Sequence, residues 1–533
     1  MIVAIDYASP SVFESTTDRA FLGISANQRR PVRFHGRLIR NIPLFRFTLR
    51  ALGEAIWSND TWSSDGERMS WILDPVITVH PDRIFFEAFS QDQSVYAMVI
   101  ANPAMFALDG DMTPGTTNID FTAWLWGALN ELRSSRETWL RVGSQGVEIK
   151  TKGAGGRFEK KVDLPDQWVR GFLQVSGAMA MPGTRITVSP ADLLAAIRFL
   201  RYTKARVSPR AVRYEFTPGE DARLVLEPWE HTVRLRGAEH AYTEPRIIRT
   251  WGRRRLKLIE PLLPFATSVD IYLKGRGLPS FYAVKLPDLT FLLGLSGSTE
   301  QNWGETGNFD LLGDARQVDL EILDGVQMEL ERRFHASPRE LAEALGQTPT
   351  LVGRALERLC RRGRAMFDVE SRDFRHRELF ESGIDEEKLF PPDPRTEAAQ
   401  EWLSQKAVSI QQCEPQETRK IKRLKTPDGP TQREVIYRDW RVNGVVGPET
   451  TEIVVADSGR IIFGTCGCPF FQENLLGKGP CEHMIALFQA SHERRRDLPT
   501  SQAVSPAIPS STGADDKEEG FDTEEGEEEG EDK

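Results

Sequence analysis

The stretch that decides the fold near the C-terminus reads Gly464-Thr465-Cys466-Gly467-Cys468-Pro469-Phe470 and, after a short interval, Gly479-Pro480-Cys481-Glu482-His483. It contains three thiols and one imidazole in two pairs, each with one residue between its members. Three thiolates and one imidazole form a closed tetrahedral ligand set for structural zinc. The sequence therefore predicts one structural Zn²⁺ ion, which has no open position for catalysis. Its expected ligands are Cys466, Cys468, Cys481 and His483.

The residues before the first two ligands predict a β-hairpin. Two β-rich runs, from Glu452 and up to Phe463, flank the turn signal Asp457-Ser458-Gly459. Cys466 and Cys468 follow the second strand, where a period of two places both side chains on the same side of an extended chain. We expect this hairpin to present two of the four ligands.

The residues after the second pair predict a helix. Apolar residues recur after Pro480 at the spacing of one helical face: Met484, Leu487 and Phe488. Cys481 and His483 then lie at the helix N-terminus, where the positive end of the helix dipole favours a thiolate. The whole stretch is expected to form a ββα unit closed by one ion.

Two other interpretations of the cysteines stay open at this point. Cys466 and Cys468 are also compatible with a redox dithiol, and all three thiols with ordinary buried side chains. The histidine two residues after the third cysteine favours the metal. Cys360 and Cys413 lie outside the pattern, so five cysteines provide no disulfide framework and indicate a reduced, cytoplasmic setting.

The Cys-x-Cys and Cys-x-His pairs, after a hairpin and at a helix start, resemble the SWIM zinc finger. This module occurs in bacterial proteins, in Mutator-type transposases and beside some chromatin-remodelling-type helicases. Upstream stretches also resemble bacterial SWIM-family proteins of about this length: 114–121, 164–172 and 278–281. The resemblance implies zinc binding and contact with DNA or protein partners, and it implies no reaction. Some bacterial relatives are encoded beside MoxR-type AAA ATPases, which are therefore a candidate partner class.

The length of 533 residues predicts a multidomain chain, at about 150 residues per domain. We expect an α+β protein with mixed α/β N-terminal regions, a winged-helix-like segment, the ββα zinc unit and a disordered acidic tail. The expected boundaries are 1–150, 151–325, 326–395, 396–499 and 500–533. No apolar run reaches the length of a membrane span and no secretory signal opens the chain, so a soluble, cytoplasmic protein is expected.

The net charge of −10 comes from one end of the chain. Twelve acidic residues and two lysines lie between Asp515 and Lys533, so the rest of the sequence is neutral overall. This Gly/Glu/Asp-rich stretch follows a Pro/Ser/Thr-rich linker and cannot bury a core, which predicts disorder. The tail either keeps the chain soluble or occupies a basic surface, of this protein or of a partner, in competition with nucleic acid.

Residues 326–395 have the pattern of a winged helix-turn-helix. Ser337-Pro338-Arg339-Glu340 is a capping box that opens a helix ended by Gly346, and Thr348-Pro349 caps a second helix ended by Gly363. Two short strand-like runs follow, up to His376. Helix, short turn, helix and hairpin is the outline of a winged helix.

Basic residues cluster at three places. The second helix of the winged-helix-like segment has an arginine stripe, for which we expect contacts to phosphates or base edges, and the alternative is a solvated face of a protein-binding domain. The run 419–425 has five positive charges in seven residues, and Arg253–Lys257 is a further cluster; such runs are usually solvated loops. The candidate nucleic-acid contacts are Arg354, Arg358, Arg361, Arg362, Lys420, Lys422, Arg423 and Lys425.

Motifs for catalysis are absent from the sequence. It contains no phosphate-binding P-loop, dinucleotide fingerprint, His-Glu-x-x-His or Gly-x-Ser-x-Gly motif, and its other histidines lack ligand spacing. We therefore expect a non-enzyme without a small-molecule substrate or a membrane partner. Its predicted function is binding of nucleic acid, most readily DNA, and the alternative is a protein–protein adaptor or regulatory component of a larger assembly.

Overall fold

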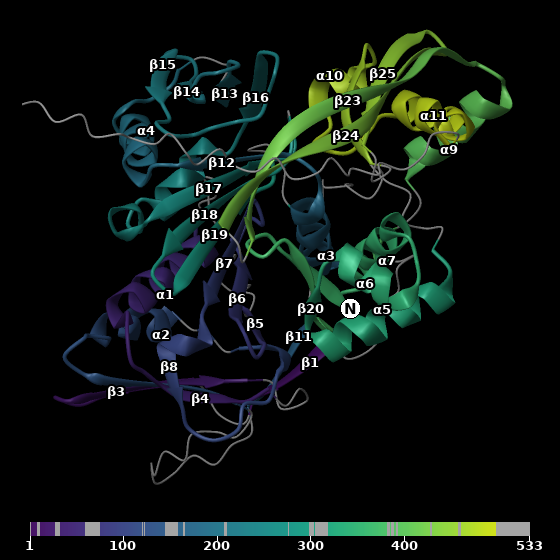
Figure 1. Ribbon diagram of the computed structural model, residues 1–533. Coiled ribbons are helices and arrows are strands. Elements are labelled where there is room, and N and C mark those ends of the chain that lie inside the picture. The colour runs from purple at the N-terminus through teal and green to yellow at the C-terminus, as the bar shows by residue number, and fades with distance from the viewer. Residues whose placement is uncertain are drawn as a thin grey trace, which may run out of the picture.

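The computed structural model describes most of the chain up to Arg496 and shows a strand-rich mixture of α and β structure (Figure 1). No described helix is long and apolar enough to cross a membrane. The acidic tail, and the turn predicted at 457–459, lie outside the described residues. The residues described are 2–7, 11–26, 32–58, 75–119, 121, 123–143, 158–163, 166–206, 210–275, 277–297, 303, 318–380, 384, 389–390, 393–426, 429–456 and 460–496.

The largest sheet has eight strands in the order β12-β17-β18-β19-β7-β6-β5-β9. Strands from both sides of the boundary predicted at residue 150 share it, because β19 pairs antiparallel with β7. The bounds are β5 Val76–Val79, β6 Ile84–Phe89, β7 Val95–Ala101, β9 Gly115–Asn118, β12 Thr184–Val188, β17 Ser268–Leu273, β18 Ser280–Leu286 and β19 Leu289–Leu295.

Both faces of this sheet are buried, and strand β7 shows why. Alternate residues of a strand face opposite sides. Val95 and Val99 lie in one core with α1 (Ile42–Ile56), whereas Tyr96 and Met98 lie in a second core with α3 (Asp166–Ala180). Every position of β7 is therefore buried, which explains its continuous apolar sequence.

Smaller sheets and helices surround this centre. A five-stranded sheet has the order β2-β3-β10-β4-β8, a four-stranded sheet the order β15-β14-β13-β16, and β1 pairs with β11. Helix α4 begins at the N-cap Ser189, and the Ser-Pro pair there is typical of a helix N-terminus. The bounds are β1 Ile2–Tyr7, β2 Val12–Ser15, β3 Arg19–Ser25, β4 Phe34–Leu38, β8 Phe106–Leu108, α2 Ala123–Ala128, β10 Glu137–Gly143, β11 Phe158–Asp163, α4 Pro190–Tyr202, β13 Val212–Phe216, β14 Arg223–Leu226, β15 His231–Arg234, β16 Arg246–Thr250 and the 3₁₀ helix η4 Arg253–Ile259.

The two helices predicted in 326–395 are present. The capping box between Ser337 and Glu340 is formed, and α6 ends at Gly346 with a positive φ of 63°. Helix α5 precedes them and was not predicted; α7 packs against α5, α6 and also α3 of the body. The bounds are α5 Leu320–Arg333, β20 His335–Ala336, α6 Pro338–Leu345, α7 Pro349–Arg361, β21 Ala365–Asp368 and β22 Asp373–His376.

Buried ion pairs fasten this segment to the central sheet. Arg377 Nη1 lies 2.7 Å from Glu87 Oε2, and both side chains are fully buried. Arg375 donates two hydrogen bonds of 2.9 Å to the carboxylate of Asp82, in the turn between β5 and β6. Buried charges of this kind need their partners, because a single unpaired charge there is strongly destabilising.

The C-terminal module is a four-stranded sheet, ordered β23-β24-β25-β26, covered by helices. The basic run 419–425, for which a solvated loop is the usual expectation, lies inside a strand of 19 residues. The side chains of the module join the core that also contains α3. The bounds are α9 Pro394–Ser404, β23 Val408–Thr426, β24 Gly429–Val446, β25 Glu449–Val455, β26 Ile461–Cys466, α10 Pro469–Asn474, α11 Glu482–Ala490 and α12 His492–Arg496.

Candidate metal centre

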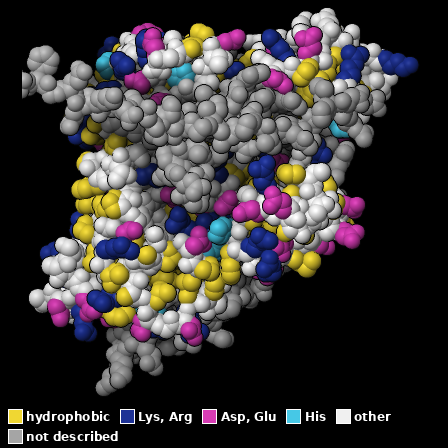
Figure 2. Space-filling view, in the orientation of Figure 1, with side chains coloured by type: hydrophobic (Ala, Val, Ile, Leu, Met, Phe, Trp, Pro, Cys, Tyr) yellow, Lys and Arg dark blue, Asp and Glu magenta, His cyan; other side chains and the backbone are white. Residues whose placement is uncertain are grey.

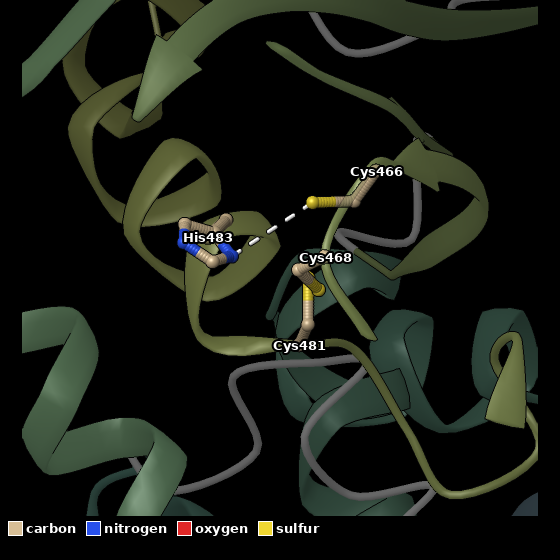
Figure 3. Close-up of side chains that lie close together, drawn as sticks. All are labelled: Cys466, Cys468, Cys481 and His483. Atoms are coloured by element: carbon tan, nitrogen blue, oxygen red, sulfur yellow. Dashed lines mark hydrogen bonds between the residues drawn. The ribbon is translucent and has the colours of Figure 1, made fainter. Parts of the chain in front are cut away.

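The four predicted ligands meet at one point of the C-terminal module (Figure 3). Cys466 is the last residue of β26, and Cys468 is the N-cap of α10, a short helix that was not predicted. Cys481 is the N-cap of α11, and His483 lies in its first turn. Strands β25 and β26 pair antiparallel, so the strands of the predicted hairpin are confirmed.

The ligand atoms have the spacing that a tetrahedral zinc site requires. All four lie within 4.8 Å of one another and all four residues are buried. Sγ of Cys466 lies 3.8 Å from Nδ1 of His483, the contact drawn in Figure 3. Zinc bonds of about 2.3 Å to sulfur and about 2.0 Å to nitrogen put these two atoms roughly 3.5 Å apart at a tetrahedral angle. The Cys466–His483 pair therefore fits the ion after a contraction of a few tenths of an ångström.

The protonation equilibria of the four groups are strongly linked. A hydrogen bond from the Cys481 thiol lowers the pKa of Cys466 to about 3. The same bond, followed by burial, raises the pKa of Cys481, while burial raises that of Cys468. Burial lowers the pKa of His483, but its hydrogen bond to Cys466 and the negative charges of Cys466, Glu482 and Glu449 together raise it overall. Without metal the cluster thus holds protons between its ligands, and zinc replaces these protons when it binds.

Small residues leave room for the helix that provides two ligands. A Cβ on Gly464 of β26 would lie 2.9 Å from Sδ of Met484, and a Cβ on Gly444 of β24 would lie 2.7 Å from Cδ1 of Leu487. The ring of Trp402 in α9 lies 5.7 Å from the imidazole of His483. Strands, α9 and α11 therefore enclose the ligands in a packed core.

Arg395 holds the loop that leads into Cys481, and the sequence analysis missed it. Its Nη1 donates hydrogen bonds of 2.9 Å to the carbonyl oxygens of both Lys478 and Pro480. Asp393, the N-cap of α9, pairs with the same guanidinium at 2.6 Å. The motif spacing gave no sign of this contact, because Arg395 lies more than 80 residues before the loop.

Two of the four candidate arginines in and next to α7 lie in internal contacts. Arg361 is 8 % exposed, and its guanidinium lies over the ring of Phe390 at 4.3 Å. Arg358 donates a hydrogen bond of 3.1 Å to the carbonyl oxygen of Val318. Arg354 and Arg362 are half-buried.

The other candidate contacts lie on a different element, the long strand β23. Lys420 is opposite Val435 of β24, Lys422 opposite Arg433, Arg423 opposite Gln432, and Lys425 opposite Pro430. The two groups of basic residues therefore belong to α7 and to the β23–β24 pair, and no single described element contains both.

Lys274 is a buried amine outside the metal centre. It lines a cavity of about 260 Å³ beside α3, and burial lowers its pKa to about 7. Its Nζ donates hydrogen bonds to the carbonyl oxygens of Met179 and Met181, at 2.7 and 2.6 Å. These carbonyls end α3, so the lysine caps the C-terminus of that helix.

Comparison with known proteins identifies the module. Residues 449–492 match the family model of the SWIM zinc finger. All four ligands lie within this matched range. No curated protein matches the chain significantly. The chain is 12 % identical to proliferating cellular nuclear antigen from Entamoeba histolytica, with a TM-score of 0.32 over 49 % of this chain and 97 % of that one. It is 11 % identical to a chain of the solved structure of the C-terminal region of FEN-1 bound to A. fulgidus PCNA. The TM-score is 0.31, over 50 % of this chain and 97 % of that one.

Proposed function

From the premise that this chain carries a SWIM zinc finger with one structural zinc ion, we propose that it binds nucleic acid, most readily DNA. The binding element is the ribbon formed by residues 415–439 of β23 and β24. The zinc ion has a structural role at the base of this ribbon. A cytoplasmic, non-catalytic protein is part of the same proposal.

The extent of the ribbon is the observation that supports this proposal. Strand β24 pairs with β25 only between Trp440 and Val446, whereas its pairing with β23 continues to the Thr426–Gly429 end. Figure 1 shows the two strands continuing as a long ribbon beyond β25. Residues 415–439 contain seven basic and four acidic residues. A two-stranded ribbon fits the DNA major groove, and basic residues provide the attraction to phosphate.

A short ladder connects the metal centre to this ribbon. Cys466 in β26 pairs with Thr451 of β25, and Thr451 pairs on its other side with Gly444 of β24. Leu487 of α11 packs directly over Gly444. Because zinc joins α11 to the end of β26, it holds the strands from which the ribbon extends.

The helical segment before the module has a lesser part in this proposal. Its order of helices and strands is that of a winged helix-turn-helix, and we propose that fold for residues 318–380. Arg358 and Arg361 have internal partners, so Arg354 is the secondary contact that we propose on α7.

A charge-neutralised ribbon provides the test. The zinc-loaded full chain and a variant with Lys420, Lys422, Arg423 and Lys425 changed to Gln are titrated into a labelled random DNA duplex over a series of salt concentrations. Four lost phosphate contacts reduce the slope of log affinity against log salt by up to about 3.6. In the control variant, four arginines that lie in the N-terminal sheets or in the loops between their strands and helices are replaced by Gln. These are Arg19, Arg37, Arg40 and Arg133. Equal slopes for the ribbon variant and the unmodified chain would refute DNA contact by the ribbon.

A protein adaptor is the second candidate function, and one observation favours it. Leu320 and Met328 on α5 are 59 % and 67 % exposed, so this helix presents two large apolar side chains to solvent. A partner, for which AAA ATPases of the MoxR type are one class to test, would cover them. Co-purification of a partner that is lost in a Leu320→Lys, Met328→Lys variant, together with no DNA binding, would favour this candidate.

A further inference from the structure

A cavity of about 540 Å³ lies far along the chain from the zinc module, between the end of α4, the 3₁₀ helix η4 and Trp229. Its volume falls in the range of ligand sites, roughly 300–1,000 Å³. The apolar part of its wall is formed by Ile197, Leu200, Trp229 and Leu258. No residue of the ribbon lines this cavity.

Positive charge gathers around this apolar wall. Lys204, Arg254 and Lys257 line the cavity and are exposed, and none has a carboxylate within 4 Å among the described residues. Of the two carboxylates in the lining, Glu260 is already engaged by Arg201 at 3.4 Å. Burial, and then repulsion from Arg210 and Arg254, lower the pKa of Arg253. An anion in this cavity would relieve that repulsion.

On the face of the molecule shown in Figure 2, the Lys and Arg side chains of the described residues are interspersed with Asp and Glu side chains. This mixture of charges contrasts with the exposed cations around the apolar wall of the cavity. Unpaired cations around an apolar wall indicate a ligand that is apolar at its centre and acidic on both sides. A peptide with one aromatic residue between carboxylates has this chemistry.

The acidic end of the chain contains one such peptide. Between Ala514 and Lys533, Phe521 is the single large apolar residue. Glu518 and Glu519 precede it, and Asp522, Glu524 and Glu525 follow it. Acidic stretches that serve only for solubility have few aromatic residues. The aromatic residue inside this run therefore calls for a second role, and its flanking charges complement the rim of the cavity.

We propose that the cavity between α4 and η4 binds the acidic segment around Phe521, with the phenyl ring against Trp229 and Leu258 and the neighbouring carboxylates on Arg254 and Lys257. Roughly 25 residues separate Arg496 from Phe521, and they span about 80 Å when extended. That reach is several times the radius of gyration of about 24 Å expected for a compact chain of this length. This contact does not depend on DNA binding, and it gives the tail a target.

Photocrosslinking in the intact chain tests the contact directly. The photoreactive residue p-benzoylphenylalanine replaces Phe521, and irradiated monomer is digested and analysed by mass spectrometry. The expected crosslinks join position 521 to the peptides that contain Leu200, Trp229 or Leu258, and they disappear at high salt concentration. The same probe at Ala514 is the control for general proximity. Crosslinks that are confined to other surfaces, or that form only between molecules, would overturn the proposal.

A binding measurement then separates the aromatic contact from general charge attraction. A fluorescein-labelled peptide of residues 514–533 is titrated into the full chain carrying Phe521→Ala, whose own tail lacks the anchor. The same peptide with alanine at position 521 should bind at least tenfold more weakly, because it loses the phenyl contact. Arg254→Glu with Lys257→Glu should weaken binding by a similar factor, whereas the exposed pair Arg19→Glu with Arg133→Glu should not. Equal binding of the two peptides would refute an aromatic pocket, whatever the DNA titration shows.

Discussion

Arg395 provides the sharpest test of how the zinc site is built. Its guanidinium is 12 % exposed and donates to the carbonyl oxygens of Lys478 and Pro480, just before the ligand Cys481. The change Arg395→Ala removes both hydrogen bonds and leaves Asp393 without this cation. The residue touches no ligand atom, so any effect on zinc must act through the position of the loop.

The magnitude follows from the number and type of bonds. A hydrogen bond from a charged donor contributes about 1.5–3 kcal/mol, and water replaces part of it where the carbonyl is reached by solvent. A net loss of about 2 kcal/mol is therefore expected for the pair of bonds. Metal binding and folding of such a module are coupled, so this loss appears in zinc affinity. Each 1.4 kcal/mol is tenfold, which predicts a decrease of about 30-fold, inside the range found for residues that support metal ligands.

Competition with a chromogenic zinc chelator measures this affinity in the full chain. Arg441→Ala is the matched control, since Arg441 is in the same module but is 50 % exposed and pairs with Glu452 at 2.6 Å. Arg395→Lys should lie between the two, because an ammonium group keeps the charge but loses the fork of donors. Zinc affinity within twofold of the unmodified protein for Arg395→Ala would refute the argument.

Two further predictions concern the metal ligands and His80, whose Nε2 lies 2.9 Å from the carbonyl oxygen of His376. Cys481→Ser should lower zinc content below one ion per chain by elemental analysis, while Cys413→Ser, outside the cluster, should leave it unchanged; full zinc content in the Cys481 variant would contradict the ligand set. Burial lowers the pKa of His80 from 6.5 to about 4, so the unfolded chain takes up this proton first as the pH falls. The free energy of unfolding should therefore decrease between pH 6.5 and about pH 4, by at most roughly 3 kcal/mol at 1.36 kcal/mol per pKa unit. Thermal denaturation of His80→Phe should show a shallower pH dependence over this window, and an identical slope would count against the buried histidine.

Local backbone geometry explains why the sequence predicted most of the metal centre. The two ligands of each pair are separated by one residue, one pair at a strand end and the other at a helix start. Backbone geometry alone therefore brings the two members of a pair near each other. The helix starts at Ser189, Ser337 and Thr348 were predictable for the same reason, because each cap bonds within its own first turn. None of these inferences depends on which distant elements pack together.

The sequence by itself therefore determined the SWIM finger, its four ligands, the helix caps and the location of the acidic residues. Only the tertiary structure decided where the basic residues lie: Arg361 in an internal contact, and Lys420 in a strand paired with β24. It also decided the pairing of β7 with β19 and the contact of Arg395 with the ligand loop. The physical reason is that these contacts join residues tens to nearly two hundred positions apart. Their formation depends on how whole elements pack, which no local spacing in the chain encodes.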